Sequence, residues 1–392
     1  MSSSPAYTVV DQFDEDEFPD VPAAPAALLA ALRTVPDPRQ RQGLRHELDG
    51  ILTLVACAVV AGSRSFVAIA EWAQAATPYA MGRLGILGEV PSESTIRRTL
   101  QRLDADGLDV ILGAWAALYH VADPQQMQVI ALDGKTLRGA RGPDGRGRHL
   151  LAALSHDTAI VLGQLDVDGK TNEIPMLSKL LDTINILGAL ITADALHTQT
   201  AHADYLVTER GAHYLLTVKR NQPTLHRQLA ALPWAEVPIT DIQNDRAHGR
   251  EERRTLKVVT VAAGIGFPHA RQAIQITRKR RKLKSKKWST ETVYAITDLA
   301  PEHARPHHLQ TWLRGHWAIE TRLHWVRDVT YGEDNSQTRT RNGPQVMASI
   351  RNLAINLIRL SGATNIAASI RPKSVVRAHA RFRWVASACR GG

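Results

Sequence analysis

The chain has little cysteine, few aromatic residues and no long apolar run, and each shortage excludes a class of protein. Cys57 and Cys389 are the only cysteines, so the sequence offers neither a disulfide framework nor a cysteine-based zinc site. This usage favours a reducing compartment. The longest apolar run, at 51–62, is too short to span a bilayer and predicts a core helix. Because the N-terminus has no cationic start followed by an apolar block, we expect no secretory signal and a cytoplasmic location at the nucleoid.

The abundant feature is positive charge. Lysine and arginine number 48 against 38 acidic residues, which gives a formal net charge of +10 and a pI near 9.8. An excess of this size favours a polyanionic partner, with nucleic acid ahead of a membrane surface. The length of 392 residues suggests two or three domains. The contents of 44% hydrophobic and 22% charged residues are typical of a globular protein.

Changes in composition divide the chain into regions. An acidic lead-in is predicted to be disordered, and a helical stretch follows it. Strands then alternate with helices, which describes a mixed sheet with helices packed against it. The predicted fold class is therefore α+β, or mixed. The expected regions are 1–24 (acidic tail), 25–122 (helical), 128–232 (alternating), 233–302 (β-rich insertion), 303–362 (helical) and 363–392 (basic tail).

The segment 91–103, "PSESTIRRTLQRL", predicts a helix capped by Ser92. Its apolar residues recur at helical spacing, and its arginines fall on the other side. We expect it to be the second helix of a helix-turn-helix that contacts DNA through Arg97 and Arg98. The alternative is an ordinary amphipathic helix with a solvated basic face.

Two aspartates follow apolar strands. The run Val129–Leu132 ends in Asp133, within "QVIALDGKTLRGA", and Asp194 follows the strand in "ALITADALHTQ". Asp-Gly is also a common turn dipeptide, and we expect Gly134 to turn the chain away while Lys135 supplies a cation near bound phosphates. In a sheet of this order the two strands can lie side by side. Both carboxylates would then share one edge, as oxygen ligands of a divalent cation must.

A third carboxylate lies on a predicted helix, within "RGHWAIETRLHWVRD". At about 100° per residue, Glu320 falls on a polar face beside an apolar stripe, so the helix could dock on the sheet and point Glu320 at the aspartates. Surface ion pairs with that face are the alternative, and Glu333 and Asp334 in the next loop are rival third ligands. Three carboxylates with two Mg²⁺ ions are a known solution for phosphodiester chemistry. The other members of the face are His316, His324 and Arg327.

With these residues in place, the chain resembles the DDE transposases of bacterial insertion sequences, in the branch that includes the H-repeat-associated proteins. The resemblance runs from about residue 28 to 360. It implies an RNase H-like catalytic domain, of which 128–232 is the first part and 303–362 carries the glutamate. The stretches that support it are "DPRQRQGLRHELDGILTLVACAVVAG", "IALDGKTLRGA", "IVLGQLDVDGKTNEIP", "ITADALHTQ", "YLLTVKRNQ", "HGREERR", "RGHWAIETRLHWVRDVTYGED" and "RNLAINLIRL".

The resemblance also implies the site and its partners. Asp133, Asp194 and Glu320 would be the catalytic triad and the ligands of two Mg²⁺ ions, with Mn²⁺ as a substitute. The partner would be double-stranded DNA, both transposon ends and target, bound by a homodimer in the synaptic complex, with no membrane involved. The long gap between Asp194 and Glu320 would hold the β-rich insertion, which relatives of this type carry.

The sequence departs from the wider superfamily around the glutamate. That superfamily tends to place Tyr, Arg and Lys at fixed spacing, where this chain has Leu313, His316 and Arg327. Arg327 keeps the charge, and His316 would be cationic only if its pKa were raised, so Arg314 is expected to supply the missing phosphate contact. Glu173, in "TNEIP", matches a family motif. We interpret it as a carboxylate in the first turn of a helix, where it offsets the dipole.

Further cations are expected to contact DNA. The segment "RKRRKLKSKKW" has eight cations within 278–287 and ends in Trp288. It suggests a hairpin tip that grips the DNA backbone, with Trp288 stacking on an unstacked base. The alternative is a disordered loop with Trp288 in the next strand. The expected DNA contacts are Lys219, Arg220, Arg278, Lys279, Arg280, Arg281, Lys282, Lys284, Lys286, Lys287 and Trp288, with Lys135, Arg314, His316, Arg327, Arg97 and Arg98.

The sequence thus predicts a transposase that binds terminal inverted repeats, cleaves DNA with metal ions and joins the released 3′-hydroxyl to target DNA. Two other functions stay open. One is a DNA-binding protein descended from such an enzyme that no longer cleaves. The other is a structure-specific nuclease that cuts without strand transfer.

Overall fold

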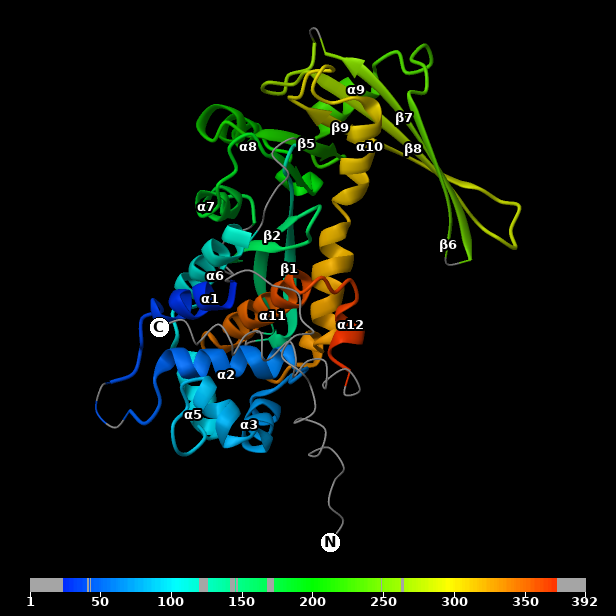
Figure 1. The fold of residues 1–392 in the computed structure, drawn as a ribbon. Coiled ribbons are helices and arrows are strands. Elements are labelled where there is room, and N and C mark those ends of the chain that lie inside the picture. The colour runs from blue at the N-terminus through cyan, green and yellow to red at the C-terminus, as the bar shows by residue number, and fades with distance from the viewer. Residues whose placement is uncertain are drawn as a thin grey trace. The chain divides into compact units, whose positions relative to one another are not determined.

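A computed structural model describes residues 24–371, except 41, 43, 120–125, 142–144, 146, 168–172, 248 and 262–263. The acidic tail, apart from residue 24, and residues 372–392 of the basic tail lie outside the described residues. The chain divides into two compact units, which are described separately (Figure 1). The helical unit comprises Met1–Tyr119, Leu137–Arg148 and Trp325–Gly392, and the sheet unit comprises His120–Thr136 and His149–His324. Among the described residues, no helix is long and apolar enough to cross a membrane.

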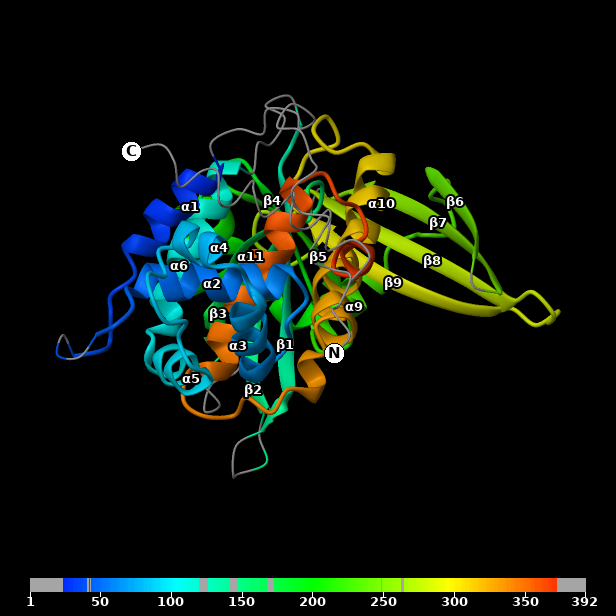
Figure 2. The same cartoon turned by 60° about the horizontal axis from the view of Figure 1, so that its bottom comes forward.

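The helical unit has its core around two apolar helices. The run at 51–62 forms the predicted core helix, α2, and almost all of its side chains are buried. The long helix α11 packs against α2, α5 and α6 (Figure 2). On α5, the Ser92 side chain caps the helix by accepting from the Thr95 amide, as predicted. The helices are α1 (Ala24–Arg33), α2 (Leu48–Val60), α3 (Phe66–Ala75), α4 (Pro78–Arg83), α5 (Glu93–Arg102), α6 (Ala105–Tyr119), α11 (Gly343–Leu360) and α12 (Ile366–Ser369).

The sheet unit is built on a mixed sheet, which confirms the predicted fold class. Strands β1, β4 and β5 run parallel, and β2 and β3 form an antiparallel hairpin beside β1. The order β3-β2-β1-β4-β5, with its central strands parallel, is that of an RNase H-like sheet. The strands are β1 (Val129–Arg141), β2 (Gly147–Ser155), β3 (Val161–Val167), β4 (Leu190–Ala193) and β5 (His213–Val218).

The β-rich segment continues this same sheet. Strand β9 pairs antiparallel with β5, and the full order ends β5-β9-β8-β7-β6. One apolar cluster runs through both parts, since Leu190 and Leu215 pack in the same core as Leu256 and Ile274. The edge strand β6 was not predicted because it is mostly polar and has no buried residue. The added strands are β6 (Asp241–Ala247), β7 (Arg250–Thr260), β8 (Gln272–Lys282) and β9 (Ser289–Thr297).

Short helices accompany the sheet. Pro223 begins α9, a position at which its missing amide hydrogen costs nothing, and Gly211 closes the segment after α8 with a φ of +57°. The helices are α7 (Met176–Asp182), α8 (Thr200–Asp204) with a π-helical turn (Tyr205–Glu209), α9 (Pro223–Ala230) and α10 (Pro306–Gly315).

The segment after α10 is not the regular helix that the sequence predicted. It contains two π-helical turns, η4 (Glu320–His324) and η5 (Val326–Thr330). A π turn adds a residue per turn, so side chains four positions apart no longer line up at about 100° per residue. The face that was expected to hold Glu320 with His316, His324 and Arg327 is therefore divided.

Candidate active site

The two aspartates lie at neighbouring positions of one sheet edge. Leu132 of β1 and Ala193 of β4 are partners in the parallel register, and Asp133 and Asp194 directly follow them. The predicted side-by-side placement of the two strands is thus confirmed. Both carboxylates keep access to solvent, with side-chain exposures of 20% for Asp133 and 50% for Asp194. This is the carboxyl edge of the parallel strands, where α/β sheets commonly bind ligands.

The local structure after Asp133 differs from the prediction. β1 does not end there but runs on to Arg141, because β2 remains beside it after the pairing with β4 has ended. Gly134 therefore lies in a strand and not in a turn. Lys135 is only 8% exposed, so it does not offer a solvent-facing cation for phosphates, which corrects the expectation.

Asp194 is held by the loop in which it lies. Its side chain caps the short 3₁₀ helix Ala195–His197 by accepting from the Ala195 amide. From the neighbouring strand β5, the exposed Lys219 brings its Nζ to 3.6 Å from Asp194 Oδ1. Asn221 Nδ2 donates to the Ala195 carbonyl at 2.7 Å and ties the two loops together. A fixed carboxylate with a nearby cation thus faces solvent at this edge.

Two histidines from the α10–η4 segment contact the aspartate strands. His324 Nε2 lies 3.3 Å from Asp133 Oδ2, and His316 Nδ1 lies 3.2 Å from Thr192 Oγ1 on β4. Burial lowers the pKa of His316, against the opposing effect of the Asp133 and Asp194 charges. At neutral pH this imidazole is therefore uncharged, and His316 does not replace the arginine of the wider superfamily as a cation.

Thr192 also binds a second histidine. His156 Nε2 lies 3.0 Å from Thr192 Oγ1, and burial, together with the nearby His316 and Arg322, lowers the His156 pKa to about 3. Gly315 permits this packing, because a Cβ there would lie 2.5 Å from His156 Nδ1. The sequence pattern did not predict this contact of His156 with β4.

Glu173 is the main residue of the site whose role the sequence did not predict. It precedes α7, which begins at Met176, so it is not in the first turn of that helix. Its carboxylate accepts from His149 and, at 3.1 Å, from His197 Nε2. Burial raises the Glu173 pKa, but these hydrogen bonds outweigh it and lower the pKa to about 2. The carboxylate lies against Gly134, where any Cβ would clash with it.

The structure does not group a third acidic residue with this pair among the residues that it describes. Glu320 is exposed, between His316 and His324, which both reach the aspartate strands. Across the described residues, no three His, Cys, Asp or Glu side chains form a group that could hold a metal ion. In the helical unit, Glu333 is 2% exposed and bound by Arg327 and Arg351, so its oxygens are not available to a metal.

Two expected phosphate contacts have carboxylate partners instead. Arg327 is fully buried, and its Nε donates to Glu333 Oε2 at 2.9 Å. Arg314 is half exposed and pairs with Asp245 on β6 at 2.6 Å. Arg327 therefore has a structural role and does not face DNA, whereas Arg314 links α10 to the inserted strands.

The basic segment 278–288 belongs to the hairpin formed by β8 and β9. Its first half lies in a strand, so the alternative of a disordered loop is wrong for residues 278–282. Residues 278–282 belong to β8, and Trp288 directly precedes β9 (Figure 2). Arg278, Arg280 and Arg281 pair with glutamates across the strands, and the Arg281 guanidinium covers the Trp288 ring at 4.8 Å. The exposed cations of this hairpin are Lys279, Lys282, Lys284, Lys286 and Lys287.

Arg220 and Arg98 are exposed, whereas Arg97 pairs with Glu93 at 2.9 Å on α5. The basic face of α5 is thus partly neutralised. Its apolar face is buried as predicted, with Ile96, Leu100 and Leu103 all at 0% exposure.

Comparison with known proteins agrees with this architecture. The family model "Transposase DDE domain" matches residues 124–357, and "DDE_Tnp_1-associated" matches residues 29–116. A putative transposase, YncI, of Escherichia coli O157:H7 is 29% identical over 85% of this chain and 87% of its own length. The H repeat-associated putative transposase YhhI of Escherichia coli K12 is 28% identical over 84% and 90%.

One solved structure that matches this chain is a piggyBac transposase synaptic complex with hairpin DNA. The match covers 93% of this chain and 77% of the piggyBac chain. Its TM-score is 0.45 at 13% identity, which is too distant to assign a fold. The family model covers more than half of the chain. The chain therefore belongs to the DDE transposases, and its function is that of a transposase.

Proposed function

We propose that this transposase binds the ends of its own mobile element, cleaves the DNA there and joins the released 3′-hydroxyl to target DNA. The observation that carries the proposal is the parallel pairing of β1 and β4, which puts Asp133 and Asp194 at adjacent positions of one exposed sheet edge. Strands fix the two backbones rigidly, as a preorganised catalytic site requires.

The donor chemistry at this edge fits a hard divalent cation in part. Asp133 and Asp194 offer carboxylate oxygens, which Mg²⁺ and Mn²⁺ prefer. Glu320 is proposed as the third ligand. It is exposed within a π-helical turn, a local distortion that is frequent at functional sites, and His316 and His324 on either side of it contact the aspartate strands. We expect Glu320 to turn toward the aspartates when metal binds.

The residues of the chain then have distinct roles in cleavage. Two bound ions would activate the attacking oxygen and stabilise the leaving oxygen. Lys219 and Arg220 directly follow β5 and are exposed, and we expect them to hold phosphates near the scissile bond. His149 and His197 fix Glu173 beside Gly134, which positions the strand that carries Asp133. The lysines of the β8–β9 hairpin would bind backbone farther away, and two copies of the chain would pair two ends.

A plasmid that carries this gene with its native flanks tests the proposal. Wild type should cut at two flanking repeats in Mg²⁺ and not in EDTA, and Asp194→Asn should abolish cutting while it leaves DNA binding largely intact. Asp204→Asn is the matched control, because Asp204 is 54% exposed in the same unit and pairs with His269 away from the edge. Full cleavage by Asp194→Asn would contradict the assignment.

The products separate the proposal from its alternatives. Covalently joined products, scored by sequencing across new junctions, support strand transfer. Breaks without junctions would instead favour a structure-specific nuclease. Binding without breaks, by a folded protein, would favour a transposase descendant that no longer cleaves.

A further inference from the structure

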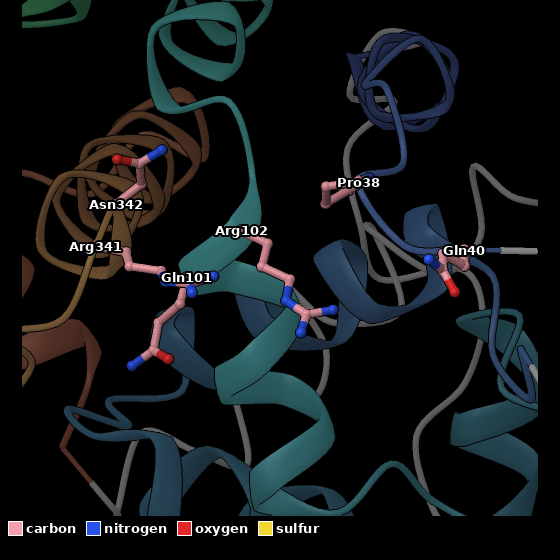
Figure 3. Close-up of a pocket in the computed structure, with 6 residues that line it drawn as sticks. All are labelled: Pro38, Gln40, Gln101, Arg102, Arg341 and Asn342. Carbon is pink, nitrogen blue, oxygen red and sulfur yellow. The ribbon is translucent and has the colours of Figure 1, made fainter.

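The helical unit contains a cavity whose charges are all positive. It has a volume of about 700 Å³ and lies between the end of α5, the start of α11 and the loop around Pro38. No carboxylate lines it. The residues that line it are Pro38, Gln40, Gln101, Arg102, Arg341 and Asn342 (Figure 3).

Its two arginines have no ion-pair partner among the residues that the structure describes. Arg102 and Arg341 are both exposed, and Figure 3 shows the Arg102 guanidinium directed into the space between α5 and the loop of Pro38 and Gln40. This distinguishes them from Arg97, which pairs with Glu93, and from the hairpin arginine Arg278, which pairs with Glu252. Two uncompensated guanidinium groups in one concavity favour an anion.

The walls of the cavity are fixed to each other. The Asn342 amide donates to the Gln101 carbonyl at 3.4 Å, and Asn342 Nδ2 donates to the Leu103 carbonyl at 2.8 Å. Arg341 has a φ of +50°, a left-handed conformation that is uncommon outside glycine. The end of α5 and the start of α11 therefore fix the backbone positions of Arg102 and Arg341 relative to each other without help from a ligand.

The lining also indicates which anion fits. It has no aromatic ring and no large apolar side chain, so it offers no aromatic platform on which a base could stack. Arginine forks and side-chain amides suit phosphate oxygens. The start of α11, an 18-residue helix whose N-cap Asn342 makes no side-chain cap bond, adds the positive end of its dipole.

We propose that this cavity, with Arg102 and Arg341 as its anchors, binds the sugar-phosphate backbone of duplex DNA. The inference rests on the proposed function, since it assumes that the protein binds DNA. It adds a contact that belongs to the helical unit, whereas the aspartate edge belongs to the sheet unit, and this contact does not depend on base sequence.

The test measures affinity for a fluorescein-labelled duplex of about 30 base pairs and arbitrary sequence, as a function of salt. Each phosphate contact contributes close to 0.9 to the slope of log K against log salt. The double variant Arg102→Gln/Arg341→Gln should therefore lower the slope by about two and weaken binding by about tenfold or more at near-physiological salt. Arg33→Gln/Arg45→Gln removes the same charge from exposed positions of the same unit and should change the slope little.

Three results would overturn the inference. If wild type binds and the cavity variant keeps its slope, the cavity is not a phosphate site and the proposed function stands. If both double variants lose the slope equally, the effect is one of net charge. If wild type does not bind the duplex at all, the proposed function fails and the inference fails with it. Circular dichroism of each variant shows that it is folded, and Arg102→Lys/Arg341→Lys should keep the slope while it loses affinity, because the fork geometry is lost.

Discussion

A substitution of Glu333 can distinguish a carboxylate that stabilises the fold from one that binds a catalytic metal. It was a rival third metal ligand by sequence, but it lies at 2% exposure between Arg327 at 0% and Arg351 at 2%. The Arg327 Nε and Arg351 Nη1 atoms each donate to it at 2.9 Å. Burial lowers the Arg351 pKa, and the Glu333 charge opposes that shift. The Glu333 carboxylate therefore compensates the cost of burying the two guanidinium charges of Arg327 and Arg351.

Glu333→Gln should therefore destabilise the helical unit. Removing one partner of a buried ion pair costs about 3–5 kcal/mol, because the remaining charge has neither water nor a counter-ion. For a unit of this size, each kcal/mol lowers the melting temperature by roughly 2–4 °C, so we expect a decrease of about 10 °C. Thermal and urea unfolding without metal measure it, and Glu302→Gln, at an exposed position, should change stability by less than about 0.5 kcal/mol.

If Glu333 were a metal ligand, Glu333→Gln would remove cleavage and leave the stability of the metal-free protein unchanged. If Glu333→Gln unfolds within about 1 °C of wild type while cleavage is lost at a temperature where it is folded, the structural reading of this residue is wrong. Replacing all three side chains by apolar ones of similar size should recover much of the lost stability, since buried ion networks often gain little over apolar packing.

Three further outcomes are expected. Gly134→Ala should abolish cleavage, because its Cβ would clash with the Glu173 carboxylate and lie 2.6 Å from His149 Nε2; wild-type activity would refute the role given to Glu173. Asp298 Oδ2 lies 2.6 Å from His213 Nδ1, and this hydrogen bond raises the His213 pKa. The pair therefore stabilises the folded protein at pH values below the unfolded pKa of about 6.5, and this contribution is lost as the pH rises through the folded pKa. His213→Gln should accordingly flatten the fall in unfolding free energy above about pH 6.5, and an unchanged pH dependence would contradict the pairing. Changing Lys284, Lys286 and Lys287 to Gln should lower the salt slope of duplex binding, whereas Glu302→Gln should not; an equal slope would mean that the hairpin does not touch DNA.

Local patterns predicted the sheet and the capped helices well. Ser92 was recognised because N-caps depend on residues within one turn of each other. The strands of Asp133 and Asp194 were recognised because buried parallel strands are short apolar runs, and their pairing followed from the order of elements.

Contacts between distant segments were not predictable in this way. The role of Glu173 depends on His149 and His197, which the fold brings together from different strands and loops. Charged residues such as Arg327 and Glu333 are expected at the surface from the hydrophobic pattern of the sequence. In the structure, tertiary packing buries the two as an ion pair. Because of the π-helical turns at Glu320–His324 and Val326–Thr330, side chains that a regular helix would align on one face point in different directions.

The central claim is that Asp133 and Asp194, joined by Glu320 when metal binds, form a divalent-metal site, and titration of the folded protein with Mn²⁺ by calorimetry tests it most directly. We expect wild type to bind Mn²⁺, and Asp133→Asn/Asp194→Asn and Glu320→Gln each to weaken binding by about tenfold or more. Asp204→Asn and Glu302→Gln should bind as wild type does. Unchanged Mn²⁺ binding by the double aspartate variant would contradict the claim, and unchanged binding by Glu320→Gln alone would remove Glu320 from the site.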